Sequence, residues 1–268
     1  ESDVRISTLA TNYNLRCSKG FVNGKVKIIH YRRGPFNLIE KTINSSLAPR
    51  IYLWWNGKLH VFEAPKFNPK ASKKINAFIR NNNYEHNPNK ILGFFRMFIK
   101  KARWKPRGLV RKMKKTRGVI YIATGENYVN EALASAASLK KHMPNLPVTL
   151  FTDIDVKSKY IDNVVKINNP KYTFEDKVRY ISKSPYNYTL FLDTDTYICD
   201  DFSELFDLLD RFDIAVSKLP LRKLSNIKDI PKSFMLLDSS IILFKKSPKT
   251  QKLFSNWLKL YLRDKKGV

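Results

Sequence analysis

Apolar runs of strand length alternate with a helical segment in the second half of the chain. Strands are predicted at residues 118–124, 147–153, 164–167 and 188–192, and a helix at 126–142. Within that helix, small and apolar side chains fall on one face suited to packing on a sheet: Ala132, Leu133, Ala136 and Leu139. Alternation of strands and helices predicts an α/β fold with a mostly parallel, doubly wound, Rossmann-like sheet.

The most informative stretch is the apolar strand that ends at Leu192. Two carboxylates spaced one residue apart, Asp193 and Asp195, follow it directly. The carboxyl ends of strands form the edge at which open α/β sheets bind ligands. As the chain leaves the sheet, carboxylates at i and i+2 can converge on a hard divalent cation such as Mn²⁺ or Mg²⁺. An isolated Asp-x-Asp is otherwise most often a solvated turn.

Further elements frame this stretch. Two strand-forming runs around Asn56-Gly57 predict a hairpin over residues 50–62. Residues 66–90 are polar and read as a linker with a short helix at 73–80. A helix at 174–181, a helix at 202–209, a strand at 234–244 and a late helix at 251–266 complete the prediction.

Composition limits the class of protein. The 268 residues are 43% hydrophobic and 13% aromatic, which is ample for a packed core. The formal net charge of +27 favours acidic partners such as nucleoside diphosphates, anionic lipid or nucleic acid, although a bias toward Lys, Asn, Ile and Tyr would also produce it. Only Cys17 and Cys199 are present, so no disulfide framework is expected. Without a signal peptide or an apolar membrane span, a cytoplasmic location is expected.

A basic segment separates the two halves of the chain. Residues 91–117 hold eleven Lys or Arg side chains and no acidic one, interleaved with aromatic and aliphatic residues. This pattern is typical of a helix at an anionic membrane surface, so peripheral membrane association is one interpretation. A linker helix that docks on its neighbour is the other. Specific nucleic-acid binding is not expected, because no helix-turn-helix, zinc or ribonucleoprotein motif accompanies the charge.

The region around the two aspartates resembles a known family. The apolar lead-in, the pair Asp193 and Asp195, the acidic exit Asp200-Asp201 and the following helix resemble the Asp-x-Asp region of the GT-A nucleotide-sugar glycosyltransferases, glycogenin-like in pattern. The resemblance implies a metal-dependent transferase that moves a sugar from a nucleoside diphosphate donor, with UDP-sugar expected, to a hydroxyl of a glycan, lipid or protein. A non-catalytic scaffold with the same fold is the alternative.

A second segment resembles the C-terminal part of the same family. Residues 26–34 contain a short strand that ends in His30 and is followed by Gly34, and in the family this histidine completes the metal site. The family's Lys-Pro character downstream is replaced by residues 35–38, Pro-Phe-Asn-Leu, which weakens any assignment of phosphate contacts there.

The order of the two segments is the reverse of the family's order. Residues 1–48 read as the end of such a domain, 49–117 as hairpin, linker and basic segment, and 118–268 as the start of a nucleotide-sugar-binding domain. Either two tandem domains meet in this chain or one domain is circularly permuted. We favour the tandem arrangement, in which His30 and Asp193 serve different sites of a longer protein.

The resemblance implies roles for further residues. Thr124 and Tyr128 lie in the first loop, which holds the base and ribose in the family and is not a Gly-rich phosphate cradle. Lys177 matches a basic residue that faces the donor phosphate and ribose. The triplet Asp238-Ser239-Ser240 stands where the family has an Asn-Ser-Gly or similar triplet beside the sugars. Asp238 is the catalytic candidate, as an acceptor for a sugar hydroxyl, and the donor-binding candidates are Thr124, Tyr128, Lys177, Thr194 and Ser239.

Overall fold

A computed structural model describes residues 4–9, 13, 15–16, 19–22, 24–30, 36–48, 50–55, 58–63, 116–218 and 237–266. The predicted linker helix at 73–80 and all but the last two residues of the basic segment 91–117 lie outside the described residues. The membrane-surface interpretation of that segment therefore stays a prediction. Within the described ranges, no helix is both long and apolar enough to cross a lipid bilayer.

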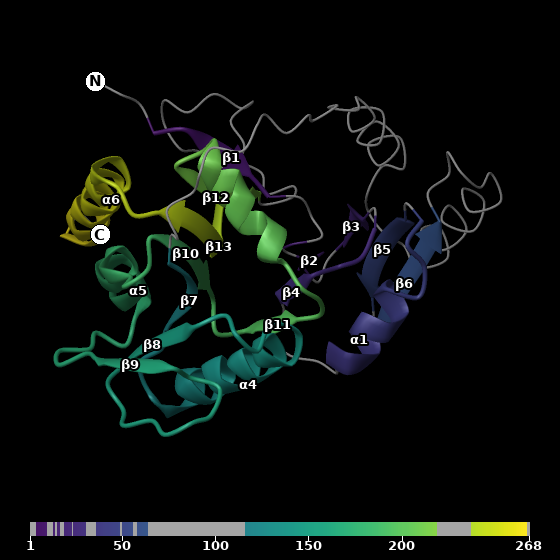
Figure 1. Ribbon diagram of the computed structural model, residues 1–268, viewed down its shortest axis with the longest axis horizontal. Coiled ribbons are helices and arrows are strands. Elements are labelled where there is room, and N and C mark those ends of the chain that lie inside the picture. The colour runs from purple at the N-terminus through teal and green to yellow at the C-terminus, as the bar shows by residue number, and fades with distance from the viewer. Residues whose placement is uncertain are drawn as a thin grey trace.

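A seven-stranded sheet forms the centre of the molecule (Figure 1). Only β13 runs antiparallel to its neighbours, and the other pairings are all parallel. The mostly parallel α/β sheet is therefore confirmed. In spatial order its strands are β1 (Ile6–Thr8), β12 (Ile214–Lys218), β13 (Leu237–Lys245), β10 (Tyr188–Leu192), β7 (Arg117–Ile122), β8 (Val148–Thr152) and β9 (Asn163–Lys166).

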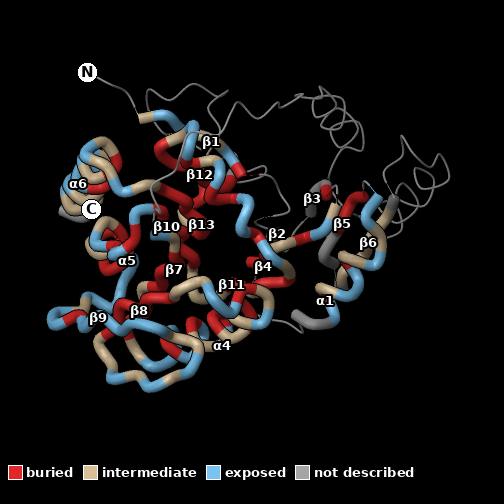
Figure 2. The backbone as a smooth tube through the Cα atoms, viewed as in Figure 1, coloured by how far each residue is buried: buried red, intermediate tan, exposed pale blue. Residues whose placement is uncertain are grey.

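Helices cover both faces of this sheet, as the doubly wound prediction requires. Side chains alternate along β10, so Leu190 and Leu192 enter one core while Phe191 enters the other. Helix α4 (Glu126–His142) packs into the first core. Helix α6 (Pro248–Lys266) packs into the second and also contacts α5 (Phe174–Tyr180). Figure 2 shows the buried residues concentrated along the central strands.

Two predicted helices differ in detail from the structure. On α4, Ala132, Ala136 and Leu139 are fully buried as predicted, whereas Leu133 is only partly buried. The predicted helix at 202–209 is present as a 3₁₀ helix, Ser203–Asp210. Its first turn is closed by a hydrogen bond of 2.9 Å from Leu205 N to Phe202 O, three residues earlier, the bond type that winds the chain more tightly than an α-helix.

The N-terminal residues form two small sheets beside the main one. One contains β11 (Thr196–Ile198), β4 (Ile28–His30) and β2 (Leu15–Arg16), and the other contains β3 (Lys19–Val22), β5 (Arg50–Trp55) and β6 (Lys58–Glu63). Strands β5 and β6 pair with Trp55 opposite Lys58, which confirms the predicted hairpin. A third core joins both small sheets to α1 (Phe36–Ile43) and includes Val22, Val26, Ile29, Ile39, Ile43, Tyr52 and Cys199.

Strand pairing ties the N-terminal segment to the main unit. Strand β1 lies parallel to β12, and β4 lies antiparallel to β11, the strand that follows the two aspartates. Within this chain, residues on either side of the basic segment thus belong to one folded unit.

Candidate metal and nucleotide site

The two aspartates lie in the short loop between β10 and β11. All five residues of β10 are buried, so the strand is fixed by the core up to Leu192. The backbone N–H of Asp193 donates to Ser240 O at 2.8 Å, which continues the pairing with β13 past the end of the strand. Because β11 starts at Thr196, the chain turns within three residues and both carboxylates stay at the carboxyl edge of the sheet.

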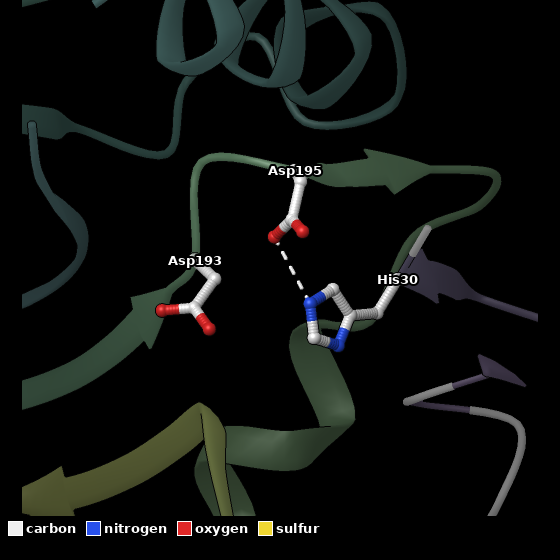
Figure 3. Close-up of side chains that lie close together, drawn as sticks. All are labelled: His30, Asp193 and Asp195. Carbon is white, nitrogen blue, oxygen red and sulfur yellow. Dashed lines mark ion pairs between the residues drawn. The ribbon is translucent and has the colours of Figure 1, made fainter. Parts of the chain in front are cut away.

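His30 reaches this edge from the other segment. It is the last residue of β4 and lies opposite Thr196 in the ladder with β11. Its Nε2 is 2.9 Å from Asp195 Oδ1 (Figure 3). One potential ligand atom from each of His30, Asp193 and Asp195 lies within 4.8 Å of the other two. An imidazole with two carboxylates fits a divalent cation such as Mn²⁺, whereas oxygen ligands alone would suit Mg²⁺.

A buried chain of hydroxyl groups holds the aspartate loop in place. Tyr121 OH lies 2.8 Å from Ser135 Oγ, and Ser135 Oγ lies 2.8 Å from Thr196 Oγ1. Thr196 Oγ1 in turn donates to the carbonyl oxygen of Asp193 at 2.8 Å. Burial raises the pKa of Tyr121, so the phenol stays neutral. These hydrogen bonds link β7 and α4 to the loop. In the sequence, the sign of this arrangement was Ser135, a polar residue on the apolar face of α4.

Lys177 contacts Asp193 from α5. Its Nζ donates to Asp193 Oδ1 at 2.7 Å and to Ser239 Oγ at 3.2 Å, and it lies 4.7 Å from the centroid of the Phe191 ring. Burial lowers the pKa of the Lys177 ammonium, and the charge of Asp193 opposes that shift. The structure therefore brings three of the predicted site residues, Lys177, Asp193 and Ser239, into direct contact.

Asp238 is the residue before Ser239 on β13. It is buried on β13, and its carboxylate accepts hydrogen bonds from Ser240 Oγ at 2.7 Å and Ser240 N at 3.2 Å. Its charge also acts on Lys177. Part of its accepting capacity is thus used inside the triplet, and its contact with a sugar stays a prediction.

The first loop presents its predicted residues in different ways. Thr124 is buried, and its Oγ1 donates to Asp176 Oδ2 at 3.0 Å. The backbone N–H groups of Lys171 and Tyr172 also donate to Asp176. The Thr124 side chain therefore orders the loop from inside. Tyr128 is 57% exposed on the first turn of α4, where its ring is open to a ligand.

A second carboxylate near this loop was missed by sequence reasoning. Asp153 follows β8, and its Oδ1 accepts from the backbone N–H of Gly125 at 2.9 Å. Its Oδ2 accepts from Tyr172 OH at 3.0 Å. Gly125 has a φ of 84°, a left-handed value that glycine adopts without a Cβ penalty. A carboxylate directly after a parallel strand was the available signal, as at Asp193.

Thr194 lies between the two aspartates and faces α4. Its Oγ1 donates to Glu131 Oε2 at 2.7 Å. Glu131 was not singled out from the sequence, because an exposed acidic side chain on a helix carries no pattern of its own.

The chain was compared with known protein families, curated proteins and solved structures. No family model matches the chain, and no curated protein matches it. Among solved structures, the glycosyltransferase GlyE of Streptococcus pneumoniae TIGR4 is 14% identical, over 58% of this chain and 41% of that chain, with a TM-score of 0.43. The apo form of GlyE is 16% identical, over 57% and 40%, with a TM-score of 0.43.

A third solved structure is the galactosyltransferase LgtC in complex with donor and acceptor sugar analogues. It is 13% identical, over 55% of this chain and 65% of that chain, with a TM-score of 0.36. The aligned region spans less than two thirds of each of these neighbours. The chain is thus similar in part to glycosyltransferase structures, and its own fold is a mixed α/β fold around a mostly parallel sheet.

Proposed function

We propose that the chain is a metal-dependent glycosyltransferase that takes a sugar from a nucleoside diphosphate donor, UDP-sugar being the expected one. The observation that carries the proposal is the group His30, Asp193 and Asp195 at the carboxyl edge of the parallel sheet. Lys177 stands beside the group and would supply a second positive charge. A divalent cation and an ammonium at one sheet edge suit a diphosphate, whose charge they would neutralise.

Different residues would bind the donor and stabilise the departing diphosphate. A cation bound by the two carboxylates and the imidazole would act as a Lewis acid toward the leaving diphosphate. The Lys177 ammonium, held by Asp193 and Ser239, would add to the positive field at the same place. Asp238 and Ser239 would border the transferred sugar, with the Asp238 carboxylate accepting from a sugar hydroxyl. The acceptor is proposed to be a hydroxyl of a glycan, lipid or protein.

The domain arrangement is part of the proposal. Residues of 1–48 and of 118–268 would act together in one donor site, since His30 and Asp195 touch within this chain. A site divided between two tandem domains would leave His30 without a role in the binding measured on this chain.

The direct test is calorimetric titration of UDP with and without Mn²⁺. The protein is expected to bind UDP only when Mn²⁺ is present, and Asp195→Ala is expected to abolish this metal-dependent binding while the circular dichroism spectrum stays unchanged. Asp155→Ala is the matched control, because Asp155 pairs with Lys166 on the surface with a side chain that is 97% exposed. Equal, metal-dependent binding by the Asp195→Ala variant would discard the site.

A further inference from the structure

Glu131 occupies a distinctive place between the two parts of the candidate nucleotide site. It lies on α4 three residues after Tyr128, so the two side chains are neighbours on one face of the helix. Both are exposed. The hydrogen bond from Thr194 then fixes Glu131 against the loop that carries Asp193 and Asp195.

These contacts give a spatial order. The open ring of Tyr128 comes first, the Glu131 carboxylate second, and the aspartate loop third. A nucleoside diphosphate has the same order of parts, with a flat base, a ribose that carries hydroxyl groups, and a diphosphate. When the diphosphate lies at the metal ligands and the base at Tyr128, the ribose lies at Glu131.

The chemistry of Glu131 fits a ribose and does not fit a phosphate. A carboxylate only accepts hydrogen bonds, so it repels phosphate oxygens and attracts hydroxyl groups. Thr194 donates to Oε2, and among the residues that the structure describes the other oxygen, Oε1, has no hydrogen-bond partner. In dinucleotide-binding sheets, an acidic side chain accepts from the ribose 2′-hydroxyl in the same way.

We propose that Glu131 accepts a hydrogen bond from the ribose 2′-hydroxyl of the donor and thereby selects ribonucleotides over 2′-deoxyribonucleotides. The inference rests on the proposed function, because it requires a nucleoside diphosphate at the aspartate loop. It adds a specificity residue that belongs neither to the metal ligands nor to the phosphate-facing lysine.

A purely structural role of Glu131 predicts something different. If Glu131 only held Thr194 in position, removing the Glu131 side chain would weaken the binding of UDP and of 2′-deoxy-UDP by the same factor.

The experiment compares UDP with 2′-deoxy-UDP by calorimetry in the presence of Mn²⁺. The unaltered protein is expected to bind 2′-deoxy-UDP roughly tenfold more weakly, as expected for the loss of a hydrogen bond to a charged group. Glu131→Ala is expected to bind both nucleotides equally, at the level of 2′-deoxy-UDP in the unaltered protein. Asp155→Ala, which removes an exposed surface carboxylate paired with Lys166, is the matched control and should keep the preference.

Three results would overturn the inference. No preference in the unaltered protein would refute ribose recognition while leaving metal-dependent UDP binding intact. A preference that survives in Glu131→Ala would assign recognition to another residue. No metal-dependent binding of either nucleotide would refute the proposed function and this inference together, so the two failures are distinguishable.

Discussion

The two sides of the candidate metal site are supported in different ways. The aspartates follow β10, which lies in the middle of the seven-stranded sheet with buried cores on both faces. His30 is the last residue of β4, a three-residue strand in a small three-stranded sheet. A continuous core therefore holds the aspartate side, whereas the His30 side is built from short strand pairings whose buried residues Ile28 and Ile29 enter the first and third cores.

Polar contacts between distant segments also join the His30 side to the main unit. Lys27 Nζ contacts Asp200 Oδ2 at 3.0 Å and the carbonyl oxygen of Asp201 at 2.6 Å, just after β11. Tyr13 OH donates to Glu204 Oε1 at 2.7 Å. Each partly exposed pair contributes little alone, on the order of 1 kcal/mol or less. We therefore expect that the His30 side chain can be removed without unfolding the sheet that holds the aspartates.

The largest expected effect comes from the core of the main sheet. Phe244 is fully buried on β13 and packs edge-on against Phe254 of α6, with 4.8 Å between the ring centroids. Phe244→Ala is expected to lower the free energy of unfolding by about 3–5 kcal/mol, because it opens a cavity in the core. Urea unfolding followed by circular dichroism measures this loss. Leu260→Ala, at a half-exposed position of α6, is the control and should change the free energy by less than about 0.5 kcal/mol.

A smaller effect is expected where β1 joins β12. The buried Asp213 accepts from the backbone N–H of Arg5 at 2.7 Å and pairs with Lys245 Nζ at 2.8 Å. Asp213→Ala is expected to cost about 2 kcal/mol, the usual value for charged hydrogen bonds. In Asp213→Ala, the amide hydrogens of β1 and β12 should exchange faster than those of β10. A uniform loss of protection across the whole sheet would contradict a local effect at this junction.

Asp213 also determines in which direction the stability of the fold changes with pH. Burial alone would raise the pKa of Asp213, but the hydrogen bonds from Lys245 and Arg5 outweigh it and hold the pKa well below the ordinary 3.8. The stabilisation is therefore complete above the unfolded value and is lost as the pH falls toward the folded one. Acid titration of stability should be shallower in Asp213→Ala than in the unaltered protein. Asp264→Ala, whose ion pair with Arg263 is exposed, should not change the slope.

The sequence predicted the main sheet because its signals are local. The helix Glu126–His142 has the predicted bounds, and β7, β8 and β10 agree within two residues, since each apolar pattern sets its own period. The placement of Asp193 at a strand end followed from the same pattern. Ordering of Thr124 by Asp176 was not predictable, because a side chain's hydrogen-bond partner 52 residues away leaves no local trace.

Long-range pairing explains what the sequence alone left open. The strand before His30 was visible, yet its pairing with the strand after Asp195 joins segments that are more than half the chain apart. The local patterns were therefore compatible with both the tandem and the permuted arrangement, and the tandem one was favoured. Register between β4 and β11 depends on the third core, in which Ile29 and Cys199 are both buried, and such packing emerges only when the segments meet.

The most direct test of the composite site is Mn²⁺ affinity with and without His30. Titration of Mn²⁺ in the presence of UDP should show at least about tenfold weaker metal binding in His30→Ala, with the free energy of unfolding nearly unchanged. His142→Ala, which removes an imidazole at the far end of α4, should bind Mn²⁺ like the unaltered protein. Unchanged Mn²⁺ affinity in His30→Ala would contradict a site built from both segments of the chain.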